Sequence, residues 1–296
     1  MRRHRTTARG TLVSLALASL TLAALASPPA SGKGQAVPRI VFPLVAKTVL
    51  WDNYGDPRGN GRHAGIDMEN PWRAPVVAAE AGKVEYAVST LGGCMLYLYG
   101  RSGTMYLYIH LNNDLGPRND NRGKCVEGTA FAVRNGSSVL AGQQIAFNGD
   151  SGDADGNHHL HFEVHPKGGA DVNPFPHLRR AVKHLFAARE GTRFSLGLRG
   201  HVVAAGGGTL RLTATSVRSY PGGRWLAIDP RQLEVAVAAE TAVGDKLAGA
   251  LGAQSHAALA KQTRVAVFTQ RGTVTQEALA GAPGALTAGR VTPLVP

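Results

Sequence analysis

The stretch "NHHLHFEVHP" (residues 157–166) holds four of the 11 histidines of this 296-residue chain within eight positions. Read with the period of two of a β-strand, one face of the stretch is polar and the other apolar. The polar residues are His159, His161, Glu163 and His165, and the apolar ones are Leu160, Phe162 and Val164. An ordinary solvated strand face is rarely mostly imidazole, so the polar face indicates a functional site and the apolar face a core.

Two further segments supply residues of the same chemistry. In "MYLYIHL" (residues 105–111), alternation places Tyr106, Tyr108 and His110 on one face, opposite three aliphatic residues. In "GRHAGID" (residues 61–67), His63 and Asp67 are four apart and fall on the same side of an extended segment or of a helical turn.

Imidazoles combined with one carboxylate are the ligands that hold Zn²⁺ with one coordination position open. The candidate set is His63, Asp67, His110, His159 and His161. Any one of these residues alone would be read as an ordinary polar residue of a β surface, but three segments that fit one site favour a metal centre. Spacing does not decide which histidine of "HLH" is a ligand.

Short β patterns separated by Gly, Asn and Asp turns run from residue 41 to 175 and predict an antiparallel β domain. A long polar excursion, residues 112–138, interrupts them. It contains Cys125, and the other cysteine of the chain is Cys94. In an exported chain two cysteines favour a disulfide over thiolate metal ligands, since neither belongs to a C-x-x-C pair. Such a link would stabilise the fold by roughly 3–4 kcal/mol.

The remaining sequence predicts a helix followed by a second domain. Residues 176–190 have the apolar period of a connecting helix. Residues 191–296 contain short strand patterns around an Ala-rich stretch that could hold a helix. We expect a small C-terminal β-barrel or OB-like domain there, and a mainly β chain overall.

The start of the chain has the features of a secretory signal. Four arginines precede an apolar run at residues 12–26, which ends in "ALA" before Ser27. Because 15 residues are short of the roughly 20 that span a bilayer, we expect a cleaved signal peptide (1–26) rather than a membrane anchor. A linker (27–40) rich in Pro, Gly and Ser follows. The expected product is exported, to the medium, the cell wall or the periplasm, with no transmembrane segment after cleavage. General and twin-arginine export both remain open.

The chain is basic, with a formal net charge of +12; removing the four arginines of residues 1–26 leaves about +8. A basic exported protein is drawn to polyanions. The sequence has no nucleic-acid-binding motif and no helix of clustered Lys and Arg, so an anionic cell envelope, and not nucleic acid, is the expected partner.

The order of these motifs, over about residues 60–165, resembles the lysostaphin/LytM-type zinc metallopeptidases. These bacterial enzymes cut peptide bonds in peptidoglycan and share the duplicated hybrid motif fold. The motifs are "GRHAGID", "APVVAAEAGKV", "YLYIHL" and "VLAGQQIAFNGDSGDADGNHHLHFEV". The sequence lacks H-E-x-x-H, which excludes the thermolysin-like arrangement.

The resemblance implies one Zn²⁺ per chain, held by His63, Asp67 and His161, with His110 and His159 as catalytic residues. Tyr108, on the predicted face of His110, is a further candidate as an oxyanion donor. Residues 112–138 depart from the family pattern and are expected to form one wall of the substrate groove.

The implied function is a secreted zinc metalloendopeptidase acting on peptidoglycan peptide cross-links. The alternative is a non-catalytic LytM-like envelope scaffold that activates other wall hydrolases. Because every expected ligand is present, the sequence favours the enzyme.

Overall fold

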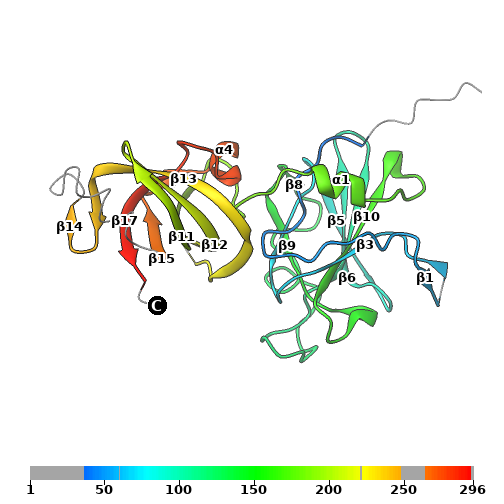
Figure 1. Cartoon of the computed structure of the whole chain (residues 1–296). Helices are drawn as coiled ribbons and strands as arrows, with labels where there is room; N and C mark the ends of the chain where they lie inside the picture. The colour runs from blue at the N-terminus through cyan, green and yellow to red at the C-terminus, as the bar shows by residue number, and fades with distance from the viewer. Residues whose placement is uncertain (1–36, 60, 221, 248–263, 295–296) are drawn as a thin grey trace, which may run out of the picture. The chain divides into compact units, whose positions relative to one another are not determined.

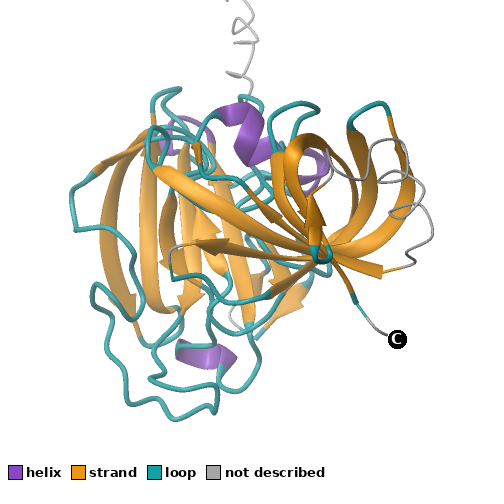
Figure 2. Cartoon of the chain, turned by 90° about the vertical axis from the view of Figure 1, so that its left-hand side faces the viewer, coloured by secondary structure: helices purple, strands orange, loops and turns teal. Residues whose placement is uncertain are grey.

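Strands make up most of the secondary structure in the computed structural model, which describes residues 37–59, 61–220, 222–247 and 264–294 (Figure 1 and Figure 2). The mainly β class predicted from the sequence is therefore confirmed. The predicted signal peptide lies outside the described residues. Ile40, at the end of the predicted linker, is already buried, so the folded domain begins before residue 41. Within the described ranges, no helix combines the length and the apolar character needed to cross a membrane.

The N-terminal half contains a six-stranded antiparallel sheet with the order β3-β10-β7-β6-β5-β8. Two small pairs, β1–β2 and β4–β9, accompany it. The strands are β1 (Pro57–Arg58), β2 (Gly61–Arg62), β3 (Ile66–Glu69), β4 (Pro75–Val77), β5 (Gly82–Ser89), β6 (Gly93–Gly100), β7 (Met105–Leu111), β8 (Ser138–Val139), β9 (Gln144–Phe147) and β10 (His159–His165). Two short 3₁₀ turns, η1 (Gly152–Ala154) and η2 (Pro166–Gly168), flank β10.

Strand β10 lies between β3 and β7 and follows the predicted alternation. Leu160, Phe162 and Val164 are fully buried in the core. Residues paired across neighbouring strands point to the same face. His161 pairs with Asp67 of β3 and with Ile109 of β7, so the register gathers the polar residues on the other face.

Strand β7 departs from the predicted alternation. Tyr108 is fully buried in the core, whereas Ile109 belongs to a small apolar cluster on the opposite face. A bulge then places Ile109 and His110 opposite the single residue Met95, and His110 has a left-handed φ of 61°. The bulge turns the His110 side chain to the same face as His161.

The polar excursion of residues 112–138 is fastened to the sheet by a disulfide and by buried packing, among other contacts. A disulfide joins Cys94 to Cys125, with 5.1 Å between their Cα atoms, as predicted. Phe131 is fully buried in the core and stacks on Tyr86 of β5. The segment is therefore an ordered part of this domain.

The predicted connecting helix over residues 176–190 is wrong in its length. Helix α1 spans only Phe175–Arg180 and ends where Ala181 becomes extended. Val182 forms a parallel bridge with Val41, and Leu185 and Phe186 are buried in the second hydrophobic core. The β bridge of Val182 and the burial of Leu185 and Phe186 therefore determine the structure of this segment, although its apolar residues recur with a helical period.

The C-terminal half forms a closed five-stranded barrel. The pairings run β11-β12-β13-β17-β15 and back to β11, and β13 with β17 is the parallel pair. This confirms the predicted β-barrel; the part of the Ala-rich stretch at residues 248–263 lies outside the described residues. The elements are β11 (Arg193–Gly206), β12 (Thr209–Tyr220), β13 (Leu226–Val243), β14 (Lys246–Leu247), β15 (Arg264–Thr269), β16 (Gly272–Thr273), α4 (Gln276–Ala280) and β17 (Thr287–Pro293).

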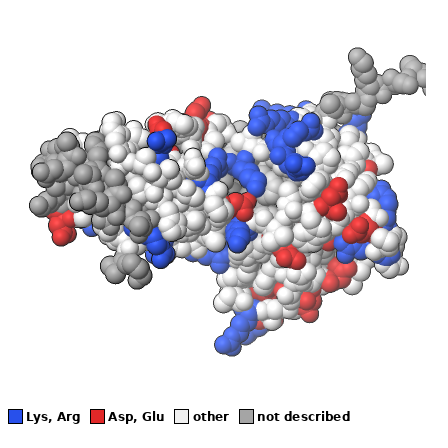
Figure 3. Space-filling model, in the orientation of Figure 1, with Lys and Arg blue, Asp and Glu red and all other residues white. Residues whose placement is uncertain are grey.

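Charged side chains are distributed in several separate groups over the face shown in Figure 3, with acidic residues between the basic ones. On this face the positive charge of the chain is spread over many positions.

Candidate metal centre

Three side chains from two adjacent strands and the turn before them meet at one point. His63 precedes β3, Asp67 lies on β3, and His161 lies opposite Asp67 on β10. The distances His63 Nε2–Asp67 Oδ1, His63 Nε2–His161 Nδ1 and His161 Nδ1–Asp67 Oδ1 are each 2.9 Å. These residues also form one of two groups in the described chain with the geometry to hold a metal ion.

The other hydrogen bonds of these side chains indicate which atom of each residue can bind a metal ion. His63 Nδ1 donates to the Asn53 carbonyl oxygen at 2.7 Å, which leaves a lone pair on Nε2. His161 Nε2 lies 2.9 Å from a carboxylate oxygen of Glu163, to which it donates, so Nδ1 can present a lone pair. With the Asp67 oxygen, three acceptor atoms converge on one point, which is the arrangement a cation satisfies.

Electrostatics at this point also favour a positive charge. Burial lowers the pKa of His161, but hydrogen bonds to Asp67 and Glu163 outweigh it and raise this pKa to about 9. Burial raises the pKa of Asp67, but hydrogen bonds from His161 and His63 reverse the shift and hold it well below its usual range. A divalent cation bound here would supply this positive charge, and His161 would then be neutral. The residues present therefore fit a metal ion of the zinc type.

Two residues that sequence reasoning missed support these ligands. Glu163 holds His161 through Oε1 and His165 through Oε2, at 2.9 and 2.6 Å. Arg58 Nη2 lies 2.7 Å from the second oxygen of Asp67. The position of Glu163 on the polar face of β10 was a signal for its role, whereas nothing in the sequence marked Arg58.

His110 and His159 lie beside this group, and His159 Nε2 is 3.7 Å from Asp67 Oδ1. Their ring centroids are 4.7 Å apart. His110 Nδ1 donates to the Ser151 carbonyl at 2.8 Å, and His159 Nδ1 to the Asn157 carbonyl at 2.9 Å. Burial lowers the pKa of both residues, that of His110 to about 4. Each therefore presents a neutral Nε2 with a free lone pair at neutral pH.

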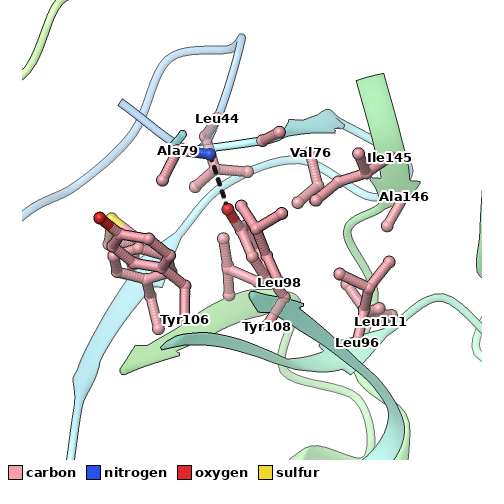
Figure 4. Close-up of a cluster of buried hydrophobic side chains, with 14 of the residues drawn as sticks. Leu44, Val76, Ala79, Leu96, Leu98, Tyr106, Tyr108, Leu111, Ile145 and Ala146 are labelled. Atoms are coloured by element: carbon pink, nitrogen blue, oxygen red, sulfur yellow. Dashed lines mark hydrogen bonds between the residues drawn. The ribbon is translucent and has the colours of Figure 1, made fainter. Parts of the chain in front are cut away.

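Tyr108 does not belong to the site, which corrects its prediction as an oxyanion donor. Its side chain is fully buried in the core, and its hydroxyl oxygen accepts the Ala79 N–H at 2.8 Å (Figure 4). Because His110 is the second residue of the bulge, the two residues point to opposite faces of β7. Tyr108 is a structural residue.

A cavity of about 710 Å³ contains the histidines and opens to solvent. Its lining residues come from β1 to β3, from residues 91–92, from β7, from residues 153–157 and from β10; they include Arg58, Arg62, His110, Asp153, Asn157, His159 and Glu163. No residue of 112–138 lines it, so the prediction that this segment forms a wall is wrong. The segment instead braces the rim, because Asn119 and Asn121 donate to Asp155 at 2.6 and 2.9 Å.

A β-sheet that presents two histidines and an aspartate as a metal-binding group, with two more histidines beside it, defines a metal-binding β domain. Residues 61–174 match the family model "Peptidase family M23". This part of the chain is accordingly similar to the domains of peptidase family M23.

Several known proteins are similar to this chain. An uncharacterized metalloprotease of Haemophilus influenzae is 33% identical over 114 residues, which cover 38% of this chain and 20% of that protein. The uncharacterized lipoprotein YgeR of Escherichia coli is 30% identical, with coverage of 48% and 52%. The murein hydrolase activator NlpD of Salmonella typhimurium is 27% identical, with coverage of 57% and 39%. The matches thus span between a fifth and about half of these relatives.

Among solved structures, the catalytic domain of the antimicrobial peptidase lysostaphin from Staphylococcus simulans is 26% identical, with a TM-score of 0.35. It matches over 45% of this chain and 92% of its own length.

Proposed function

We propose that this protein is a zinc metalloendopeptidase that hydrolyses peptide bonds in the cross-links of peptidoglycan. The observation that carries the proposal is the convergence of three acceptor atoms, on His63, Asp67 and His161, beside two neutral histidines in an open cavity. The match of residues 61–174 to the model of peptidase family M23 supports it.

The proposed zinc ion, held by His63 Nε2, Asp67 Oδ1 and His161 Nδ1, would polarise the scissile carbonyl and lower the pKa of the attacking water. The protein supplies the proton transfers. The lone pairs on His110 Nε2 and His159 Nε2 are available to accept the proton of the water, and the protonated imidazole can pass it to the leaving amine. The Ser151 and Asn157 carbonyls hold the two rings in place for this role.

The N-terminal signal and the positive net charge of the chain also agree with peptidoglycan as the substrate. We propose export through the N-terminal signal, because the apolar run at residues 12–26 and the relatives named as a lipoprotein and a murein hydrolase activator point to the envelope. The positive charge of about +8 that remains after signal removal would draw the protein to an anionic wall.

A second candidate function is activation of other wall hydrolases without catalysis, which the similarity to NlpD favours. The complete ligand group and the two free imidazole nitrogens favour catalysis by this chain itself.

The decisive experiment is digestion of defined wall cross-link peptides by the purified protein, with mass analysis of the products. Cleavage at one peptide bond, lost with a chelator and restored by Zn²⁺, is expected. No cleavage by the chain alone, combined with faster digestion by an added wall hydrolase, would instead support the activator.

A further inference from the structure

A second group of potential metal ligands lies outside the cavity. Asp114 lies near the start of the segment of residues 112–138, Asp150 precedes η1, and His158 precedes β10. Each offers one ligand atom, and these atoms all lie within 4.8 Å of one another. None of the three lines the cavity of the first centre.

Both carboxylates are fully buried, and each is only half satisfied. Asp114 Oδ1 accepts the backbone N–H groups of Asp120 and Asn121 at 2.8 and 2.7 Å, and Asp150 Oδ2 accepts that of Gly156 at 3.0 Å. The other oxygens, Asp114 Oδ2 and Asp150 Oδ1, are buried without a hydrogen-bond partner in the described structure, as is His158 Nε2. Leaving buried polar atoms unpaired is costly, above all on a carboxylate, so two carboxylate oxygens and one imidazole nitrogen in one cluster call for a common partner.

The charges in the cluster point to the same partner. Of the described basic side chains, only His158 lies within ion-pair distance of either acid, with its Nε2 3.5 Å from Asp150 Oδ2. Burial and, less strongly, the charge of Asp114 raise the pKa of Asp150. Two adjacent buried carboxylates thus carry up to two negative charges against at most one positive one, and a divalent cation would balance them.

We propose that Asp114, Asp150 and His158 form a second divalent-metal site, which takes a first-row transition ion such as Zn²⁺. Two carboxylate oxygens with one imidazole nitrogen suit such an ion, whereas Ca²⁺ prefers oxygen ligands alone.

This site would fix the segment that orients both catalytic candidates. Residues 150–158 contain the Ser151 and Asn157 carbonyls, which hold His110 and His159. A metal between Asp114 and the two ends of this segment would tie it to the excursion that the Cys94–Cys125 disulfide already fastens. The second ion is therefore a positioning element and takes no part in the reaction.

The test measures bound metal and thermal stability in the full chain. The His63→Ala/His161→Ala variant removes the first centre; after equilibration with Zn²⁺ and removal of the free ion, we expect about one equivalent to remain and the melting temperature to rise with zinc. Adding Asp150→Asn should abolish both. Glu127→Gln, at an exposed acid of residues 112–138, makes the same charge change and should leave both intact.

Retention of no zinc by the His63→Ala/His161→Ala variant would overturn the proposal, as would undiminished zinc binding after Asp150→Asn. If the aspartates instead share a proton or a water, Asp150→Asn should be tolerated and zinc should not shift the melting temperature of either protein. If the protein that carries His63→Ala, His161→Ala and Asp150→Asn does not fold, the effect of zinc on the melting temperature of the His63→Ala/His161→Ala variant still tests the proposal. Because wall cleavage is not measured, this result is independent of the proposed function.

Discussion

At the scale of single residues, His110 takes its place in the site by adopting an unfavourable backbone conformation. A non-glycine residue with φ of 61° costs on the order of 1–3 kcal/mol, which the surrounding structure must offset. The backbone N–H of His110 bonds the Gly92 carbonyl at 3.1 Å and its ring bonds the Ser151 carbonyl at 2.8 Å. The strained conformation aims the imidazole into the cavity, and we interpret it as a functional feature.

The two pairs of histidines should give different phenotypes. His110→Ala and His159→Ala should keep bound zinc and the fold but lose roughly 10²–10⁴-fold in peptide cleavage, as for a missing acid–base group. His63→Ala and His161→Ala should lose cleavage together with zinc at the first centre. Metal analysis and cleavage assays on the four variants separate the roles. Zinc loss at this centre in His159→Ala but not in His161→Ala would mean that the two roles were assigned in reverse.

Glu163→Gln should weaken zinc binding about 10- to 100-fold, because it removes the carboxylate that fixes the tautomer and orientation of His161. A competition titration with a chromophoric chelator measures the affinity of the first centre. Glu69→Gln, an exposed acid on β3, is the matched control and should bind zinc like the parent. Equal affinity in both variants would exclude a supporting role for Glu163.

At the scale of elements, strict alternation of side chains predicted the two faces of β10 correctly and those of β7 incorrectly. Alternation holds along His159–His165, so the histidines and the core residues separated as predicted. In β7 the bulge at Ile109 and His110 reverses the alternation, and period-two reasoning placed Tyr108 in the site although His110 was identified correctly. The bulge depends on the pairing with β6, which a local pattern does not contain.

The burial of Tyr108 leads to a prediction about stability. Tyr108→Phe leaves the buried Ala79 N–H without an acceptor and should destabilise the protein by about 1–3 kcal/mol. Cleavage under conditions where the variant is folded should be unchanged. Urea unfolding and peptide cleavage test this together; a large loss of cleavage with unchanged stability would restore Tyr108 to the site.

The link between Cys94 and Cys125 closes a loop whose ends are 31 positions apart. Cys94→Ala/Cys125→Ala should lower the free energy of unfolding by roughly 3–4 kcal/mol on the chain-entropy argument. Denaturant unfolding of the variant and of the oxidised parent measures the difference. Alkylation of two free thiols in the denatured, unreduced parent would show that the link does not form.

At the scale of the whole molecule, two β domains follow from the sequence, but the closure of the barrel does not. Strand patterns at residues 200–205 and 264–270 were recognised as local segments. Closure requires β11 to pair with β15 and β13 to pair in parallel with β17, contacts between distant segments that leave no local signal. The helix predicted over residues 176–190 failed similarly, because pairing with Val41 and burial of Leu185 prevailed over local period.

Acid stability should depend on His184, which is 6% exposed. Burial lowers its pKa to about 4, and the charge of Arg231 contributes. The unfolded state, with a pKa near 6.5, binds the proton first, so stability falls as pH decreases from about 6.5 to 4 and then levels off. The full loss is up to about 3 kcal/mol. Unfolding between pH 7 and 4 should show a flatter profile for His184→Gln, whereas exposed His201→Gln should follow the parent.

The bulge in β7 also has a consequence for the fidelity of folding. An uninterrupted strand can slip by two residues against its neighbour without exchanging its faces, which makes such an error hard to reject. In β7 a slip in one direction would place the left-handed backbone at Tyr108, where a bulky side chain disfavours it. A slip in the other direction would move it to Asn112, a residue type that tolerates this backbone, but would displace the Asn112 side chain from its hydrogen bonds to the carbonyls of Asp114 and Thr129. The bulge that aims His110 into the cavity thus also makes a two-residue shift of this strand pairing unfavourable.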